Sequence, residues 1–247
     1  MNPDAQIIIL AGGKGKRMGG DLPKVLIEAR GRALIEHLLV SVFSLNFKPV
    51  VVVGYKGEMV KERLGEKVDY ALQEEQLGTG HAVLCAKDVA NDAKNIVVLY
   101  GDMPNIKPET IENLLRIHSQ EQPALTMMTI KVPHFENENA GFYGFGRVIR
   151  NEKGEIEKII ELKDASEKEK NIKELNPSLF CFNAEWLWKN LPLIKNLNAQ
   201  GEYYLTDLAG LAISQGEKIT SAEIAAVQCI GVNTPEDLKR AELLLEK

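Results

Sequence analysis

Long hydrophobic runs and a positively charged N-terminal segment are both missing from this 247-residue chain. No apolar stretch approaches the roughly 20 residues that a membrane-spanning helix requires. The N-terminal segment contains an acidic residue, Asp4, in place of the basic segment of a signal peptide, and glycines interrupt the first apolar run. We therefore expect a cytoplasmic protein that has no membrane partner.

Paired cysteines and an excess of basic residues are also missing. The three cysteines, Cys85, Cys181 and Cys229, are scattered and lack metal-ligand spacing, which argues against a disulfide framework or a zinc site. Lys and Arg total 30 against 35 Asp and Glu, so a net charge of -5 gives no general attraction to nucleic acid. Any bound anion must be held by a local basic site. With 45% apolar residues, the chain can bury a substantial core.

The loop after the first apolar run lacks both of the common phosphate-binding motifs. It reads AGGKGKRMGGDLPKVL over residues 11–26, and Met18 stands where G-x-G-x-x-G needs its third glycine. No Gly-Lys-Ser/Thr follows, and the second apolar run is followed first by Lys56 rather than by the acidic residue of a dinucleotide fold. Its glycines still let backbone N–H groups approach an anion, and its basic side chains supply charge. The loop therefore predicts a phosphate site of another kind.

Apolar runs and helical patterns alternate in the first half of the sequence. Strands are predicted at residues 6–10, 49–55, 69–73 and 95–102, and helices at 31–45, 58–66, 78–90 and 108–120. This order indicates βαβ units and a parallel sheet covered on both faces. The second half has strand-like runs at 124–132, 144–151, 154–164 and 178–183, several joined by turns, which indicates an antiparallel extension. Residues 165–175 predict a charged helical face, and residues 234–247 predict a helix that Thr234 caps.

Several side chains have the chemistry of a nucleotide site. Arg17 and Lys24 are candidates for phosphate binding, because Arg forks onto phosphate oxygens and Lys supplies a point charge. Asp102 ends a predicted strand, where open α/β sheets bind ligands and where a hard oxygen suits Mg²⁺. Gln73 and the following Gly-Thr-Gly offer a planar fork and an open wall to a base. The alternatives are exposed charges, a turn-forming Asp and an exposed loop, and His81 is interpreted as structural.

These segments resemble a known family. The pattern L-A-x-G-x-G-x-R-M followed by P-K-x-L is similar to the signature of the sugar-phosphate nucleotidylyltransferases. Further matches are typical of the N-acetylglucosamine-1-phosphate uridylyltransferases, in the family's order over nearly all of the chain: QEEQLGTGHAV (73–83), LYGDMP (99–104), YGFGRVIRN (143–151), IIELKDA (159–165), QGEYYLTDLA (200–209) and GVN (231–233).

The resemblance implies a fold and a reaction. The fold is α/β, a Rossmann-like (GT-A-like) mixed sheet with helices on both faces and a smaller antiparallel sugar-binding lobe. One domain would span residues 1–247, with a nucleotide-binding half (about 1–120), a sugar-binding half (about 121–233) and a C-terminal helix (234–247). The reaction would be Mg²⁺-dependent transfer of UMP from UTP to N-acetylglucosamine 1-phosphate, which gives UDP-N-acetylglucosamine and pyrophosphate. The oligomeric state is left open.

The resemblance also implies roles for individual residues. Arg17, Lys24 and Asp102 would be catalytic, and Asp102 and Asn233 would hold the Mg²⁺. Nucleotide contacts are implied for Leu10, Ala11, Gly12, Gly13, Gln73, Gly78, Thr79, Tyr100 and Gly101, with Gln73, Gly78 and Thr79 selecting uracil. Sugar contacts are implied for Gly146, Glu161 and Asn176. The segment containing Tyr203, Tyr204, Thr206 and Asp207 would close the sugar side, although Thr206 also suits a helix cap.

The chain departs from the family pattern in three places. The family usually has Asn-Thr/Ser-Gly where this chain has Asn176-Pro177-Ser178, which predicts a reshaped sugar pocket. Gln228 replaces an acidic residue that usually precedes GVN near the presumed metal. Many members continue into a β-helix acetyltransferase domain, whereas this chain stops after AELLLEK, so acetyl transfer is not expected. Two alternatives stay open: the same chemistry on another sugar or base, and a non-catalytic UDP-sugar-binding regulatory protein.

Overall fold

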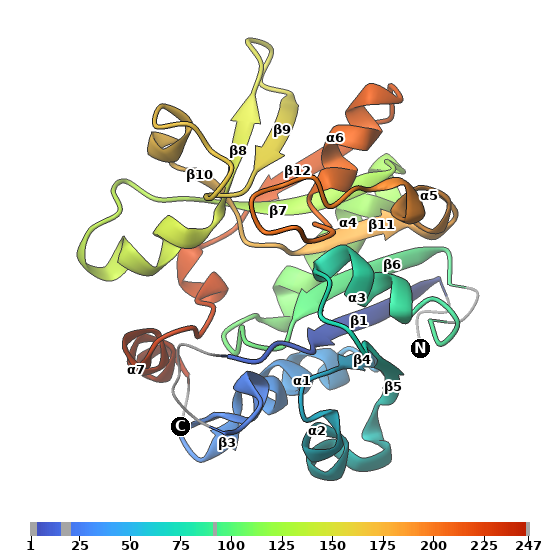
Figure 1. Cartoon of the computed structure of the whole chain (residues 1–247), viewed down its shortest axis with the longest axis vertical. Helices are drawn as coiled ribbons and strands as arrows, with labels where there is room; N and C mark the ends of the chain where they lie inside the picture. The colour runs from blue at the N-terminus through green and yellow to red at the C-terminus, as the bar shows by residue number, and fades with distance from the viewer. Residues whose placement is uncertain (1–3, 16–20, 91–92, 246–247) are drawn as a thin grey trace.

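A mixed sheet of ten strands runs through the described part of the chain, which comprises residues 4–15, 21–90 and 93–245 of the computed structural model (Figure 1). The strand order is β5–β4–β1–β6–β11–β7–β10–β8–β9, and β12 also pairs with β7. The strands are β1 (Ala5–Ala11), β4 (Val50–Val53), β5 (Asp69–Leu72), β6 (Asn95–Tyr100), β7 (Leu125–Lys131), β8 (Gly146–Arg150), β9 (Ile156–Ile160), β10 (Glu174–Asn176), β11 (Phe180–Asn183) and β12 (Ile219–Glu223). The short strands β2 (Glu28–Ala29) and β3 (Arg32–Ala33) form a separate hairpin.

The parallel part of the sheet is centred on β1, which pairs with β4 and β6. Successive side chains of a strand point to opposite faces. Accordingly, Ile7 and Ile9 belong to one hydrophobic cluster, and Ile8 and Leu10 belong to another. Burial of each isoleucine contributes about 1.5–3 kcal/mol. The continuous apolar run of β1 thus fixes this strand in the middle of the fold.

Helices cover both faces of the sheet. One cluster contains apolar residues of α1 (Leu34–Ser44), α2 (Gly57–Leu64) and α4 (Pro108–Glu121). The other contains residues of α3 (Thr79–Cys85), α5 (Ala184–Asn190) and α6 (Asp207–Ser214). The expected α/β architecture with helices on both faces is therefore confirmed.

The antiparallel part of the sheet contains one interrupted strand. β10 and β11 both pair with β7, and residues 177–179 break the ladder between them. The side-chain oxygen of Asn176 accepts a hydrogen bond of 2.9 Å from the Ser178 backbone N–H, and Ser178 has a φ of 63°. The helix expected over 165–175 is wrong: only a 3₁₀ turn at Glu169–Asn171 forms, because Leu175 is buried in the sheet, paired with β7 and β8.

The C-terminal helix α7 (Pro235–Leu244) begins as expected, with Thr234 as its N-cap. The Thr234 hydroxyl accepts a hydrogen bond from the Asp237 N–H, and the Asp237 carboxylate accepts one from the Thr234 N–H. This reciprocal pair satisfies two backbone donors at the helix start. Among the residues that the structure describes, no helix has the length and apolar character needed to cross a membrane.

Candidate active site

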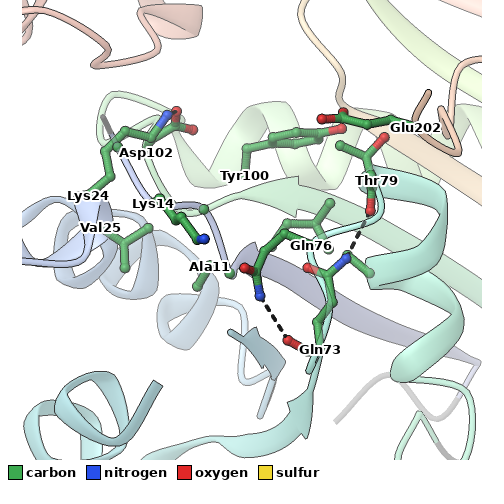
Figure 2. A pocket seen from close by; sticks show the side chains of 16 residues that line it. Ala11, Lys14, Lys24, Val25, Gln73, Gln76, Thr79, Tyr100, Asp102 and Glu202 are labelled. Carbon is green, nitrogen blue, oxygen red and sulfur yellow. Dashed lines mark hydrogen bonds and ion pairs between the residues drawn. The ribbon is translucent and has the colours of Figure 1, made fainter. Parts of the chain in front are cut away.

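A cavity of about 510 Å³ opens where β1, β5 and β6 end. The carboxyl ends of parallel strands form the usual ligand site of an open α/β sheet. Figure 2 shows Lys24 and Asp102 on one side of this cavity, Gln73 and Gln76 on the other, and Lys14 between them. The lining residues are Leu10, Ala11, Gly12, Gly13, Lys14, Gly15, Lys24, Val25, Gln73, Gln76, Gly78, Thr79, Ala82, Tyr100, Asp102 and Glu202.

The cationic side of the cavity is built on Lys24. Its ammonium group forms an ion pair with the Asp102 carboxylate and donates a hydrogen bond of 3.0 Å to the Asn233 side-chain oxygen. Pro23 precedes a 3₁₀ turn at Lys24–Leu26, which places Lys24 near the end of β6. The Val232 N–H donates to the Asp102 carbonyl, which brings Asn233 to the same place. Two residues that are 131 positions apart in the sequence, Asp102 and Asn233, thus hold one cation.

The same two oxygens suit a divalent metal ion. A carboxylate and an amide oxygen are hard ligands of the type that Mg²⁺ takes, and Mg²⁺ completes its shell with water and phosphate oxygens. Asp102 and Asn233 already converge on a single positive group, so their arrangement is compatible with a metal ion. Within the described ranges, no cluster of three His, Cys, Asp or Glu side chains could hold a metal by itself. Ligands from the substrate would have to complete such a site.

The opposite side of the cavity is built on Gln73, whose side chain is buried. Its amide nitrogen donates a hydrogen bond of 3.0 Å to the Gly78 carbonyl and lies 3.2 Å from His81 Nδ1. Its carbonyl oxygen lies beside Gly12, where an added Cβ would be only 2.9 Å away. Gly12 is therefore needed for the approach of Gln73, and a larger residue there would displace the amide.

The loop that contains Gly78 packs against a distant segment. The Gly80 N–H donates to the Tyr203 carbonyl, the Tyr203 N–H donates to Leu77, and the Leu205 N–H donates to the Thr79 hydroxyl, over 2.8–3.0 Å. Gly78 has a φ of 115°, and a Cβ at this position would lie 2.6 Å from the Tyr203 carbonyl oxygen. The glycines were expected to open a wall for a base. Gly78 and Gly80 are also required by this backbone packing.

The three residues expected to bind sugar form a second cluster. Gly146 and Asn176 are register partners across β8 and β10, and a Cβ at Gly146 would lie 3.3 Å from a carboxylate oxygen of Glu161. The Thr206 hydroxyl donates to that carboxylate at 3.1 Å. Thr206 therefore does not cap α6 with its side chain, because its hydroxyl is directed to Glu161.

Two carboxyl groups of the sugar side have raised pKa values. Burial raises the pKa of Glu161, with a smaller opposing effect from the Thr206 hydrogen bond. Burial and the nearby Asp164 charge raise the pKa of Asp207 to about 6. Burial also raises the pKa of Tyr100, which stays a neutral hydrogen-bonding group between the two clusters. The Glu161 carboxyl and the Tyr100 hydroxyl are thus buried polar groups that require hydrogen-bond partners.

Several remaining expectations can be compared with the structure. Arg17 lies outside the described residues. Gly101 lies close to the 3₁₀ turn that contains Val25. Its N–H donates a hydrogen bond to the Leu10 carbonyl, and an added Cβ would lie 3.0 Å from the Val25 side chain. The side-chain oxygen of Gln228 accepts hydrogen bonds from Thr110 Oγ1 (2.6 Å) and the Lys107 N–H (3.3 Å). Both donors lie at the N-terminal end of α4. At the position where the family usually has an acidic residue, this side chain thus bonds the first turn of α4.

Six lining residues are not among the site residues predicted from the sequence: Lys14, Gly15, Val25, Gln76, Ala82 and Glu202. Two of them have polar side chains that belong to the motifs QEEQLGTGHAV and QGEYYLTDLA, namely Gln76 and Glu202. Gln76 donates to the backbone carbonyl of Gln73 at 3.2 Å and so closes the turn after β5. Glu202 stands one residue before Tyr203, whose backbone pairs with Leu77 and Gly80. Since this pairing joins segments over 120 residues apart, local sequence patterns gave no signal for it.

Comparison with known proteins agrees with this geometry. The model of the MobA-like NTP transferase domain matches residues 7–155, so the chain belongs to this family and is a nucleotidyltransferase. It is 41% identical over 243 residues to the bifunctional protein GlmU of Brevibacillus brevis, which covers 97% of this chain and 51% of that protein. It is also 41% identical over 242 residues to the GlmU of Clostridioides difficile, which again covers 97% and 51%. The chain thus spans about half the length of the curated relatives it matches.

A solved structure shares the fold. The CMP:2-keto-3-deoxy-manno-octonic acid synthetase complexed with CTP superposes with a TM-score of 0.71 and 18% identity, over 98% of both chains. This superposition confirms the fold class inferred from the sequence. The family model and the GlmU relatives confirm the resemblance.

Proposed function

We propose that this protein transfers UMP from UTP to N-acetylglucosamine 1-phosphate in a Mg²⁺-dependent reaction that releases pyrophosphate. The observation that supports this most is the convergence of Lys24, Asp102 and Asn233 at the mouth of the sheet, opposite Gln73. Such a site neutralises phosphates on one side and offers hydrogen bonds to a base on the other.

The reaction needs charge neutralisation and alignment more than acid–base catalysis. An oxygen of the sugar phosphate attacks the α-phosphorus of UTP, a new P–O bond forms, and the bond to the β-phosphate oxygen breaks, so pyrophosphate leaves with its electron pair. With a second pKa of about 6, the attacking phosphate is already largely dianionic near neutral pH. No protein base is required.

Each side of the cavity would take one part of the substrates. Lys24 would pair with oxygens of the reacting phosphates, and Gln73 would orient the base. Asp102 and Asn233 would hold Mg²⁺, which supplies positive charge to phosphate oxygens when bound. Gly146, Glu161 and Asn176 would bind the sugar through hydroxyl hydrogen bonds.

A matrix of nucleoside triphosphates against sugar 1-phosphates, read by pyrophosphate release, tests this function. We expect UTP with N-acetylglucosamine 1-phosphate to be the most active pair, and chelation of Mg²⁺ to stop the reaction. Robust activity with another sugar phosphate and none with the acetylated amine would contradict the proposed acceptor.

A different acceptor sugar is the second candidate. Ser178 holds a left-handed φ of 63° that costs a non-glycine residue about 1–2 kcal/mol. Its backbone N–H binds the Asn176 side chain, which belongs to the sugar cluster. Strain of this kind at a binding site favours a functional cause, and a preference for another sugar 1-phosphate in the same matrix would support it.

A further inference from the structure

The orientation of the Gln73 side chain is set by two acceptors. The amide group has two N–H hydrogens, and its nitrogen is within hydrogen-bond distance of the Gly78 carbonyl oxygen (3.0 Å) and His81 Nδ1 (3.2 Å). Both hydrogens are therefore used away from the cavity, and the carbonyl oxygen is left on the Gly12 side. The reverse orientation would bring that oxygen against the Gly78 carbonyl oxygen, which can only accept.

The protonation of His81 follows from the same geometry. Nδ1 can accept from Gln73 only when it carries no hydrogen, so the hydrogen of the neutral ring is on Nε2. That nitrogen lies 3.8 Å from the Cys85 sulfur, one helical turn further along α3. His81 is thus held between a residue of the cavity wall and its own helix.

We propose that His81 is a positioning residue for base selection, which acts by keeping the Gln73 carbonyl oxygen directed into the cavity. An oxygen acceptor at this place favours a base that presents a ring N–H, as uracil does at N3. Cytosine has an unprotonated nitrogen at N3, so two acceptors, this nitrogen and the Gln73 carbonyl oxygen, would face each other without a hydrogen between them. Removal of the His81 acceptor leaves only Gly78 to hold the amide, which can then rotate to present its nitrogen. This inference rests on the proposed uridylyl transfer.

The test compares the ratio of kcat/KM for UTP to kcat/KM for CTP in four proteins. These are the wild type, His81→Leu, His81→Asn and Cys85→Ala. The Asn side-chain oxygen can take the place of Nδ1 as an acceptor, whereas Leu offers none. We expect His81→Leu to lower the ratio by about tenfold, the scale of one net hydrogen bond. His81→Asn should keep the ratio within about threefold of the wild type, a difference smaller than one net hydrogen bond. Cys85→Ala should leave the ratio unchanged.

A purely structural role for His81 gives a different result. Partial unfolding lowers the rates with UTP and CTP equally and leaves their ratio constant. An unchanged ratio in His81→Leu, or equal losses in the Leu and Asn variants, would overturn the inference. If His81→Leu does not fold, His81→Phe replaces it, because its ring also offers no acceptor.

The wild-type arm tests the proposed function separately. If the wild type prefers UTP and the ratio of kcat/KM for UTP to kcat/KM for CTP is the same in all variants, the role of His81 is refuted, whereas uridylyl transfer is still supported. A wild type that uses CTP as well as UTP would refute both.

Discussion

Lys24 contacts the same two oxygens that the proposed Mg²⁺ requires. Its ammonium pairs with Asp102 and donates to Asn233. A divalent metal ion and an ammonium on the same oxygens would repel each other by about 2–8 kcal/mol at a separation of about 4 Å, in surroundings of high to intermediate polarity. Lys24 must therefore leave these oxygens when metal binds, and triphosphate is the natural new partner for its charge.

Replacement of this cation should separate turnover from metal binding. We expect Lys24→Met to lower kcat by roughly 100- to 1,000-fold, the scale of losing one electrostatic contact to a transition state. The same variant should bind Mn²⁺ at least about tenfold more tightly without nucleotide, because the competing charge is gone. Pyrophosphate release measures the first effect, and the free Mn²⁺ signal in electron paramagnetic resonance measures the second.

The control for this prediction is Lys48→Met, since Lys48 forms an exposed ion pair with Asp69. Neither turnover nor Mn²⁺ affinity should change in this variant. Weaker Mn²⁺ binding by Lys24→Met would mean that the ammonium and the metal do not share Asp102 and Asn233.

At the scale of elements, helix α4 is attached to the sheet through a buried histidine. His118 is 2% exposed, and its Nδ1 lies 2.9 Å from Thr126 Oγ1 on β7. Burial lowers the pKa of His118 from 6.5 to about 4, because the charged ring would lose its hydration. The folded protein therefore keeps this ring neutral where the unfolded chain protonates it.

This difference predicts a pH-dependent stability. Above pH 6.5 neither state binds the proton, so the stability associated with the lowered pKa is fully present. Between pH 6.5 and 4 only the unfolded state binds it, and stability falls by up to about 2–3 kcal/mol. Urea unfolding across this range, compared with His118→Leu, isolates the effect: the variant should lack this part of the slope. Parallel curves for the two proteins would contradict it.

The sequence predicted elements best where burial alone determines them. The strand of residues 6–10 and the helix of 108–120 were correctly placed, since each buries a strongly apolar pattern. Residues 165–175 were predicted to be helical from their charge pattern. In the structure Leu175 instead belongs to strand β10, which pairs with β7 and β8. Strand β12 was missed, because Ile219–Glu223 is defined by its pairing with β7 rather than by its composition. In the candidate site, sequence motifs identified Lys24, Asp102 and Gln73, whereas the contacts that position them are long-range.

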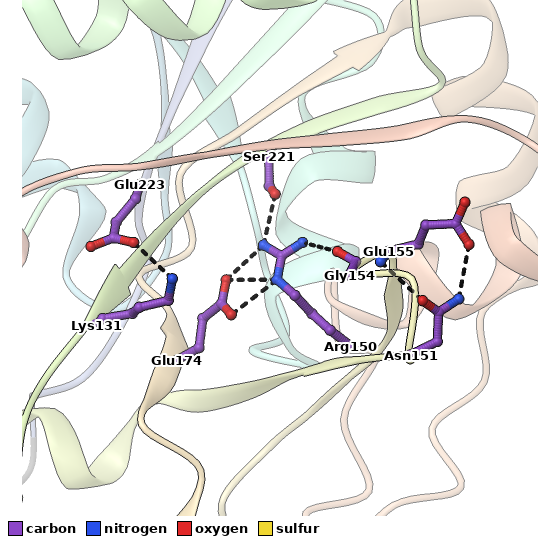
Figure 3. A network of polar contacts seen from close by, with 8 residues as sticks. All are labelled: Lys131, Arg150, Asn151, Gly154, Glu155, Glu174, Ser221 and Glu223. Carbon is purple, nitrogen blue, oxygen red and sulfur yellow. Dashed lines mark hydrogen bonds and ion pairs between the residues drawn. The ribbon is translucent and has the colours of Figure 1, made fainter.

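A polar network connects the antiparallel strands β8 and β10 with β12, which pairs with β7 in parallel (Figure 3). Arg150 of β8 makes hydrogen bonds to both carboxylate oxygens of Glu174 on β10 and to the Ser221 hydroxyl on β12. Burial by itself raises the pKa of Glu174, but the hydrogen bonds and the charge of Arg150 outweigh it, so the pKa is lowered. The Glu174 side chain is only 13% exposed, so it depends on Arg150 as its partner.

Removal of Arg150 should therefore destabilise this part of the sheet. We expect Arg150→Met to lower the free energy of unfolding by about 1–3 kcal/mol, since it removes the ion-pair partner of a largely buried carboxylate. Lys94→Met is the matched control, because its pair with Asp4 is exposed on both sides and should contribute less than about 0.5 kcal/mol. Equal losses in urea unfolding of the two variants would show that burial of the pair has no effect.

At the scale of the whole molecule, the two halves meet where their loops pair. Leu77–Gly80 follows β5 of the parallel part, and Tyr203–Leu205 precedes α6 beside the sugar cluster. Three hydrogen bonds connect these loops. The proposed base and sugar sides of the site are therefore joined by one set of backbone contacts, and we expect a change there to affect the binding of both substrates.

Gly78→Ala tests this junction. The added Cβ would lie 2.6 and 2.7 Å from backbone oxygen and nitrogen of Tyr203, and the residue would keep a φ of 115°. Since backbone atoms cannot move aside as a side chain does, we expect a loss of at least about 2 kcal/mol in unfolding free energy. We also expect KM to rise for both UTP and the sugar phosphate, as measured by pyrophosphate release under conditions where the variant is folded.

The matched control is Gly210→Ala within α6, where an added Cβ meets no atom within 4 Å. A helical glycine in open space costs about 0.5–1 kcal/mol relative to alanine, so this variant should be more stable than the wild type, with both KM values unchanged. A rise in KM for UTP alone in Gly78→Ala would mean that the two loops act separately. A rise for both substrates would mean that one backbone contact positions the nucleotide and the sugar together, which neither half of the sequence contains by itself.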